Sequence, residues 1–483
     1  MGKTRRSHPK SRSEGKVAAP RVIILAAGIG SRMRSTQPKV LHRVGGIPML
    51  ESVLRTAESL RPSQIVIVLG ASRTAIEPLL EGRGVTVVVQ DPPRGTGDAV
   101  VRALSALSDG DGPVLVLSGD VPLIRRETLV ALLDRLQDGN DLALLSFRPP
   151  EPGAFGRIVR DGRGRVARIT ELKNATARER RISEVNAGVY AFRDSALRRA
   201  ASRLREDPVS REVYLTGAAE ILASGKSRVE AVETADWREA WGINTRADLA
   251  AAEEFARRRA LERALEAGAT LVDPATIRIG PDVQLEPDVV IHPFVSLEGR
   301  TVLSERSEIL SFTRVADSSI APDAVIGPHS DVEGAQIGAR ARVGPFARIR
   351  PESVLEEDVR VGNFVETKKT TLRRGVKALH LSYLGDAEIG AEANVGAGVI
   401  TCNYDGEKKH RTTVGAGAFL GSDSQLVAPV TVGEGAYVGA GSTITQDVPP
   451  GSLALSRVRQ ENVEGWVEKR KKKTRGHGDA ETR

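Results

Sequence analysis

The sequence predicts an α/β chain in two parts, a mostly parallel sheet covered by helices and then a parallel β-helix. Short apolar runs alternate with helical stretches from residue 21 to about 245, which is typical of a parallel sheet with helices on both faces. After about residue 270, aliphatic residues recur every six positions, a period that matches neither a helix nor a half-buried strand. The length of 483 residues also suits two or three domains.

The first part spans residues 21–244 and its elements follow one another in a regular order. We expect strands at 22–28, 64–70, 84–90 and 113–120, and helices near 48–60, 96–107 and 125–137. The ends of these strands carry the segments LAAGIG, VLG, VVQ and LSGD. Because ligands of such sheets bind outside the carboxyl ends of the strands, these four segments are the candidate site.

A single helix is expected at residues 245–268, between the two parts. Thr245 can cap its start and Gly268 can end it. Alanine recurs every fourth residue from Ala252 to Ala264, and such a small-residue face suits close packing against another element. We therefore interpret this helix as a connecting arm.

The second part, residues 269–460, carries the six-residue period. Its aliphatic positions include Val414, Leu420, Leu426, Val432, Val438 and Ile444, with Ile337, Val343, Ile349, Ile389 and Val395 in other phases. Most are followed by a small residue, which predicts a triangular coil with the aliphatic side chains inside. We attribute most of the excess of glycine over an average protein to the corners of this repeat. A prism of this kind could serve only as an oligomerisation scaffold.

The composition argues against a membrane-spanning protein and against a disulfide-bonded secreted protein. The best apolar run, VIILAAG at 22–28, is far shorter than the ~18 residues of a membrane span. The single cysteine, Cys402, fits a reducing compartment, so we expect a cytoplasmic protein without membrane contact.

The net charge of +8 lies largely in two basic tails, residues 1–20 and 461–483. We expect such tails to be disordered and solubilising, with nonspecific nucleic-acid binding as the alternative. Aromatic residues make up only 4% of the chain, which leaves few stacking platforms for bases and argues against a nucleic-acid partner.

The segment LAAGIGSRM (25–33), followed by Pro38 and Lys39, is the first motif with a chemical meaning. A glycine-rich turn after a strand lets backbone N–H groups approach phosphates, which Arg32 and Lys39 can neutralise. It lacks both the Walker A lysine pattern and the third glycine of the dinucleotide fingerprint. Taken alone, the turn would fit an ordinary strand-turn-helix equally well.

With its neighbours, the segment resembles the sugar-phosphate nucleotidyltransferases. The whole order of motifs resembles the bifunctional N-acetylglucosamine-1-phosphate uridylyltransferase and glucosamine-1-phosphate N-acetyltransferase of bacteria, from about residue 21 to 465. The resemblance implies a Rossmann-like nucleotidyltransferase domain, a linker helix and a left-handed parallel β-helix. It also implies synthesis of UDP-N-acetylglucosamine, a cell-wall precursor, from UTP and acetyl-CoA with Mg²⁺. The alternative is a nucleotidyltransferase whose β-helix only forms a trimer.

By motif, the resemblance assigns the uridylyl site. Asp120 of SGD and Asn244 of WGIN match the two protein ligands of Mg²⁺, which prefers oxygen donors. Arg32 and Lys39 match the groups that stabilise phosphate charge. The residues matched to UTP or UDP-N-acetylglucosamine are Leu25, Ala26, Ala27, Gly28, Lys39, Gln90, Gly95, Thr96, Gly156, Glu171, Asn186 and Asn244. Ser118 stands beside the uridine where relatives often have an aromatic residue.

The acyl site is assigned in the same way, from a stretch where polar residues interrupt the repeat. His380 of HLSYLGDAEIG matches the general base, since imidazole can take a proton near neutral pH. The sugar phosphate is matched by Arg350, Lys368, Tyr383, Asn394 and Glu366, and acetyl-CoA by Ala397, Asn403, Tyr404, Ser422, Ala440 and Arg457. Cys402 is interpreted as a small coil residue, because direct transfer needs no covalent intermediate.

Two departures from the family pattern lie near this site: Leu379 replaces a common glycine and Thr367 a common methionine. Neither removes a reacting group. Relatives with this prism form homotrimers with active sites between subunits, and a coil face of small residues would pack closely against its symmetry mates. A third hypothesis treats both folds as a platform for RNA binding by the basic tails.

Overall fold

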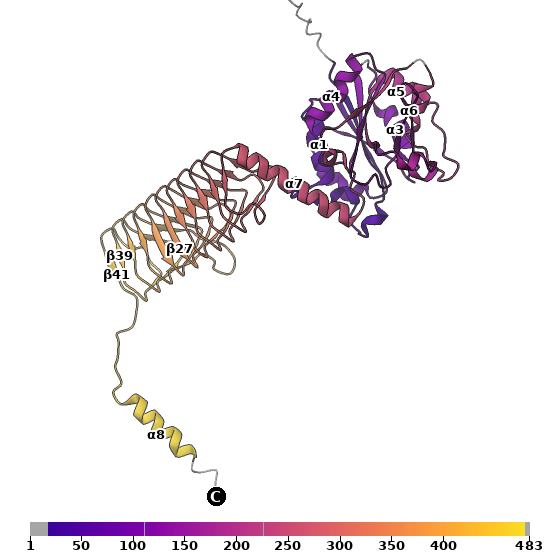
Figure 1. Cartoon of the computed structure of the whole chain (residues 1–483). Coiled ribbons are helices and arrows are strands. Elements are labelled where there is room, and N and C mark those ends of the chain that lie inside the picture. Colours follow the sequence, from indigo (N-terminus) through magenta and orange to yellow (C-terminus); the bar gives the residue numbers. More distant parts are fainter. Residues whose placement is uncertain (1–17, 111, 226, 479–483) are drawn as a thin grey trace, which may run out of the picture. The chain divides into compact units, whose positions relative to one another are not determined.

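The structure is a computed structural model that describes residues 18–110, 112–225 and 227–478. It contains two compact units, one ending at Arg259 and the other beginning at Ala260. Figure 1 shows both, and helix α7 (Arg246–Glu266) contributes residues to each. Residues 1–17 of the predicted N-terminal tail (1–20) and residues 479–483 of the predicted C-terminal tail (461–483) lie outside the described residues.

The first unit is built on a twisted sheet with the strand order β11-β7-β10-β6-β1-β4-β5. The strands are β1 (Arg21–Ala26), β4 (Gln64–Leu69), β5 (Thr86–Val89), β6 (Pro113–Ser118), β7 (Leu142–Phe147), β10 (Val185–Arg193) and β11 (Val229–Glu233). Only β10 runs antiparallel to its neighbours on this path. A hairpin of β8 (Arg157–Arg160) and β9 (Val166–Thr170) pairs with β10, and β2 (Arg43–Val44) pairs with β3 (Ile47–Pro48). The predicted mostly parallel sheet is confirmed.

Helices cover both faces of this sheet (Figure 1). One core joins the sheet to α1 (Met49–Glu58) and α4 (Arg126–Gln137). The other joins it to α3 (Thr96–Ala106), α5 (Asp194–Ala201) and α6 (Gly217–Ala223), while α2 (Arg73–Ile76) is a single short turn. The central strands are buried on both sides, which explains their continuous apolar sequences.

Helix α7 begins and ends as the sequence predicts. The backbone N–H of Thr245 donates to the Asp248 carboxylate at 2.8 Å, and the N–H of Asp248 donates to Thr245 Oγ1 at 3.1 Å. This reciprocal pair is a capping box. At the other end, Gly268 has a φ of +88°, a conformation that favours glycine at a helix C-terminus. Ala252, Ala260 and Ala264 are buried, so the small-residue face packs as expected.

The second unit is a coil of triangular section. Three sheets of 11, 10 and 9 strands form its sides, and the neighbouring strands of each sheet run parallel. The first strand is β12 (Thr270–Leu271) and the last is β41 (Leu453–Ala454). Each strand pairs with one about one turn later, as Ile291 does with Ile309. The six-residue positions point inward, and Leu420 and Val432 are fully buried.

Aromatic rings lie outside this coil, at one corner. Phe294, Phe312, His329, Phe346 and Phe364 stack in a column, with ring centroids 4.8–5.4 Å apart. We call this column the ring ladder. The ring ladder was not predicted from the sequence. The core of the coil itself is aliphatic among the described residues. The four phenylalanines of the ladder are about half exposed.

Part of the C-terminal tail is helical rather than disordered. Helix α8 (Trp466–Gly478) begins in the tail expected at 461–483. Lysine, arginine and glutamate have good helix propensity. The prediction of disorder considered only their charge. Among the described segments, no helix has the length and apolar character needed to cross a membrane.

Replacing Gly421 by alanine should destabilise the second unit. A Cβ atom at Gly421 would lie 2.5 Å from the backbone nitrogen of Ala440 and 2.6 Å from the carbonyl oxygen of Val438. We expect a loss of ~1–3 kcal/mol, as for overpacked cores, measured by chemical denaturation. Gly162→Ala is the control, because its Cβ would meet open space. Equal stability of the two variants would contradict close coil packing at Gly421.

Candidate functional site

A cavity of about 370 Å³ lies at the carboxyl ends of β1, β5 and β6. It collects these residues matched to the nucleotide or metal: Leu25, Ala26, Ala27, Gly28, Lys39, Gln90, Gly95, Thr96 and Asp120. Ser118 also lines it, with Ile29, Pro93 and Glu212, which the sequence analysis did not single out. The site therefore sits at the edge of the sheet that the strand order predicts.

Lys39 lies at the centre of a polar cluster in this cavity. Its Nζ atom contacts the Asp120 carboxylate and donates to Asn244 Oδ1 at 2.8 Å. Arg32 donates to the same amide oxygen at 2.9 Å. The fold thus brings together the predicted phosphate-binding cations and the predicted metal ligands, from positions 212 residues apart.

Two local features hold this cluster in place. Gly30 has a φ of +67°, and a Cβ atom there would lie 2.5 Å from Lys39 Cβ. Glycine therefore lets the lysine approach the turn. The backbone N–H of Ile243 donates to the Asp120 carbonyl at 2.9 Å, and the N–H of Asn244 donates to Asp248 at 2.9 Å. The second contact belongs to the start of α7.

The donor set of this cluster fits Mg²⁺. Asp120 supplies a carboxylate and Asn244 an amide oxygen, and both are hard donors of the kind that this cation prefers. Both oxygens already face a cation, the Lys39 ammonium. Asp120 and Asn244 can therefore bind a cation beside a triphosphate, and a bound cation would neutralise part of the phosphate charge during nucleotidyl transfer.

Gln90 is fixed beside the entrance to α3. It is buried, and its Nε2 donates to Gly95 O at 3.0 Å and to Asp98 Oδ2 at 2.8 Å. Thr96 Oγ1 accepts from the Leu215 backbone N–H at 3.0 Å. These bonds fix the direction of the Gln90 side chain.

Gly156, Glu171 and Asn186, which the resemblance matches to the sugar of UDP-N-acetylglucosamine, lie together next to a different cavity. The Asn186 N–H donates to the Gly156 carbonyl at 2.8 Å, and a Cβ at Gly156 would lie 3.8 Å from Glu171 Oε2. Glu171 lines a cavity of about 460 Å³ with Lys173, Arg180 and Tyr214 as further lining residues. Buried Asn186 Oδ1 has no hydrogen-bond partner among the described residues.

Burial raises the pKa of Glu171, although Thr216 Oγ1 donates to its carboxylate at 2.9 Å. A raised pKa in the folded state means that this state holds its proton to higher pH than the unfolded chain. Stability from this group is therefore lost as pH rises above the ordinary carboxyl range. The ionised carboxylate of Glu171 therefore lowers the stability of the folded state at neutral pH.

Glu171→Gln should consequently stabilise the first unit at pH 7 and much less at pH 4, where the carboxyl group is mostly protonated in both states. We expect Tm to rise by about 2–4 °C at pH 7, the shift that ~1 kcal/mol produces in a domain of this size. Differential scanning calorimetry at the two pH values measures it. An equal gain at both values would refute the role of ionisation.

The acyl residues lie on successive turns of the second unit. His380 ends β30 (Lys377–His380) and pairs in register with Asn363. Its Nδ1 lies 3.2 Å from Asn363 Oδ1. An Asn oxygen accepts, so this bond favours the tautomer with the proton on Nδ1 and leaves Nε2 free as a base. Sequence reasoning missed Asn363, which precedes the histidine by one turn of 17 residues.

Cationic side chains gather around Glu366 and Lys368. Arg350 donates to Glu366 at 2.8 Å, and Glu366 lies in register with Tyr383. The neighbouring ammonium of Lys409 and then the charge of Arg350 lower the pKa of Lys368. Lys409 was not predicted; it lies in the insertion that breaks the repeat and pairs there with Tyr404.

The other predicted residues lie on neighbouring turns of the coil. Asn394 lies in register with Lys377, and Asn403 donates to Asp386 at 2.5 Å. The predicted acetyl-CoA residues follow a chain of backbone contacts: Ala397 O accepts from Asp423 N, Ser422 O accepts from Gly441 N, and Ala440 O accepts from Arg457. Tyr404 is exposed.

Known proteins match both units. Residues 22–189 match the MobA-like NTP transferase domain, and residues 411–446 match the bacterial transferase hexapeptide of six repeats. A protein of Methylococcus capsulatus, named bifunctional protein GlmU, is 47% identical over 95% of this chain and 99% of its own. The proteins of that name from Alkalilimnicola ehrlichii and Thermus thermophilus are each 45% identical, over 95% and 92% of this chain and 98% of their own.

The chain belongs to the GlmU family. This confirms the resemblance found in the sequence and the fold class it implies, including the left-handed β-helix. It also confirms the two activities of that resemblance, uridylyl transfer and acetyl transfer to glucosamine-1-phosphate. The GlmU assignment therefore outweighs both the scaffold alternative and the RNA-binding alternative.

Proposed function

We propose that this chain acetylates glucosamine-1-phosphate in its second unit and then uridylylates the product in its first unit, with the residues assigned here. The observation that carries the proposal is the cluster of Lys39, Asp120, Asn244 and Arg32 at the strand ends, in one chain with the residues around His380. The final products are UDP-N-acetylglucosamine and pyrophosphate.

In the first unit, an oxygen of N-acetylglucosamine-1-phosphate attacks the α-phosphorus of UTP and the bond to pyrophosphate breaks. The attacking phosphate is already ionised, so the chain needs no base there. Lys39, Arg32 and the backbone of the 25–30 turn stabilise the charge and align the phosphates. Asp120 and Asn244 would hold Mg²⁺, which supplies further charge neutralisation on the triphosphate when bound.

Around the nucleotide, Gln90, Gly95 and Thr96 read the uracil. Gly156, Glu171 and Asn186 bind the sugar. The free Oδ1 of Asn186 and the position of Gly156 against Glu171 support this role. Ser118 lies in the same cavity and leaves more room beside the base than an aromatic side chain would.

In the second unit, the amine of glucosamine-1-phosphate attacks the thioester carbon of acetyl-CoA. His380 Nε2 takes the proton from the amine, the C–S bond breaks, and the thiolate of CoA leaves and is then protonated. Arg350, Lys368 and Lys409 bind the sugar phosphate, because a phosphate relieves the repulsion between the paired ammonium groups. Tyr383, Asn394 and Glu366 contact the sugar, and acetyl-CoA follows the edge from Ala397 to Arg457.

We further propose a cytoplasmic homotrimer formed by the second unit. The ring ladder supports this assembly, since a column of half-exposed phenylalanines is the kind of apolar surface that a second copy covers. It ends at Phe364, one turn before His380, so a partner on this edge would lie near the acyl site. Size-exclusion chromatography with light scattering tests the trimer.

A coupled assay tests the proposed function. Purified protein receives glucosamine-1-phosphate, acetyl-CoA, UTP and Mg²⁺, and each intermediate is quantified by mass spectrometry. We expect N-acetylglucosamine-1-phosphate to appear first and the UDP-sugar and pyrophosphate afterwards. Absence of the UDP-sugar when N-acetylglucosamine-1-phosphate is supplied directly would refute the assignment of the first unit.

A further inference from the structure

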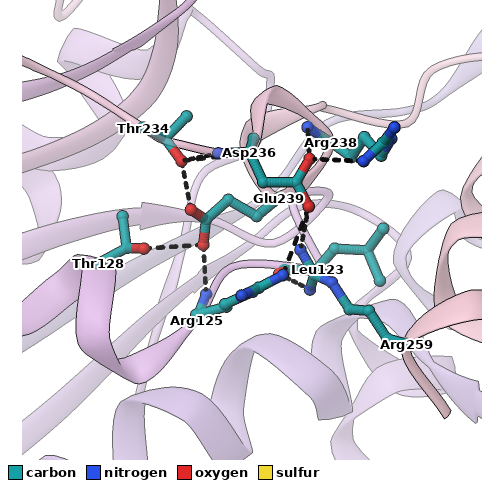
Figure 2. A network of polar contacts seen from close by, with 8 residues as sticks. All are labelled: Leu123, Arg125, Thr128, Thr234, Asp236, Arg238, Glu239 and Arg259. Atoms are coloured by element: carbon teal, nitrogen blue, oxygen red, sulfur yellow. Dashed lines mark hydrogen bonds and ion pairs between the residues drawn. The ribbon is translucent and has the colours of Figure 1, made fainter. Parts of the chain in front are cut away.

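A buried polar network lies outside the nucleotide cavity, on the segment that leads to Asn244 (Figure 2). Its centre is Glu239, only 4% exposed. One carboxylate oxygen accepts from the backbone N–H of Arg125 at 3.1 Å and from Thr128 Oγ1 at 2.8 Å. The other accepts from Thr234 Oγ1. Glu239 therefore joins the end of β11 to the start of α4.

Asp236 extends the network to helix α7 (Figure 2). Its carboxylate accepts from the Arg238 N–H at 3.2 Å and pairs with Arg125 at 3.4 Å and Arg259 at 3.5 Å. Arg259 also donates to the Leu123 carbonyl at 2.6 Å. The same short segment, 234–239, is thus tied to two others, 123–128 and α7.

The two proposed metal ligands lie next to these tied segments. Asp120 precedes the segment at 123–128 by a few residues, and Asn244 follows Glu239 by five. Between them, Ile243 is fully buried in a small core with Leu123 and Met49, and its N–H donates to Asp120 O. The chain between Glu239 and Asn244 is thus hydrogen-bonded to Asp120 through Ile243.

We propose that Glu239 is a positioning residue for the metal-binding pair Asp120 and Asn244. The proposal rests on the proposed function of the first unit. A buried carboxylate with three neutral donors is a costly choice for packing alone, whereas it fixes the spacing of two loops in a way that an apolar side chain would not. Outer residues that orient metal ligands typically change metal affinity by ~10–100-fold when they are removed.

The test compares Glu239→Ala with Glu239→Gln and the control Glu233→Ala. Glu233 ends β11 and makes an exposed pair with Arg148 at 3.1 Å. Binding of Mn²⁺ in the presence of UTP is measured directly by electron paramagnetic resonance. The Mg²⁺ concentration for half-maximal uridylyl transfer is measured in parallel, and acetyl transfer by the same protein reports on the other unit.

We expect Glu239→Ala to weaken Mn²⁺ binding and raise the half-saturating Mg²⁺ about 10-fold or more, with kcat at saturating Mg²⁺ close to wild type. Glu239→Gln should lie between, because the amide oxygen can still accept from Arg125 and Thr128. If Glu239→Ala does not fold, Glu239→Gln alone should still shift Mn²⁺ binding more than Glu233→Ala does. Acetyl transfer should be unchanged in all three.

Mn²⁺ affinity equal to that of Glu233→Ala, with only a lower Tm, would overturn the proposal and leave Glu239 a structural residue. Failure of the wild type itself to bind Mn²⁺ with UTP would instead overturn the proposed metal site, and the positioning role with it. The two failures are distinguished by the wild-type titration.

Discussion

Replacing His380 by alanine should reduce acetyl transfer by about 10²–10⁴-fold, the range that general-base catalysis contributes. The contact with Asn363 places the proton of the neutral His380 ring on Nδ1. The Nε2 atom is then free to accept a proton. Without it, the amine of the substrate keeps its proton through the attack. Uridylyl transfer from supplied N-acetylglucosamine-1-phosphate should stay at the wild-type rate, since the cluster around Lys39 belongs to the other unit.

His292→Ala is the matched control for this variant. His292 lies in the same coil, where it contacts Glu308 at 2.8 Å, and the sequence assigns it no reaction. Asn363→Ala should give an intermediate loss of acetyl transfer, because the tautomer of His380 is then no longer fixed. If His380→Ala retains full acetyl transfer, another group is the base and the assignment of His380 is wrong.

Much of this architecture could be predicted because the sequence signals are local. The six-residue period of the aliphatic positions fixes which side chains point into the coil, and the six such positions from Val414 to Ile444 are buried. The capping pair of Thr245 and Asp248 depends only on neighbouring residues. The segments at the strand ends could also be placed, because parallel strands bring their carboxyl ends to one edge.

The remaining features depend on contacts between distant segments. Asn363 and Lys409 reach His380 and Lys368 through the stacking of turns, and the insertion that carries Lys409 has no period to reveal its path. The ring ladder arises from residues 17 or 18 positions apart, so its rings look isolated in the sequence. Glu239 has no motif of its own, and only the fold places its donors around it.

Asp120→Asn should reduce uridylyl transfer by about 10²–10³-fold, since the loss of one preorganised charge at a phosphoryl site has effects of this size. The substitution keeps the shape of the side chain and the backbone contact with Ile243. It removes the one negative charge that faces Lys39 in the cluster and the only carboxylate of the proposed metal pair. Nucleotide and metal would then meet unbalanced positive charge from Lys39 and Arg32.

The measurement is kcat/KM for UTP over a series of Mg²⁺ concentrations, with acetyl transfer as the internal control for folding. Asp138→Asn is the matched variant, because Asp138 is exposed and makes only a surface contact with Arg135 at 3.4 Å. Activity that high Mg²⁺ partly restores would report the loss of metal binding, and activity that stays low at high Mg²⁺ would report the loss of charge balance at Lys39. Both effects belong to the proposed role of Asp120. Wild-type activity of Asp120→Asn at low Mg²⁺ would exclude Asp120 as a metal ligand, because an amide binds this cation far more weakly than a carboxylate does.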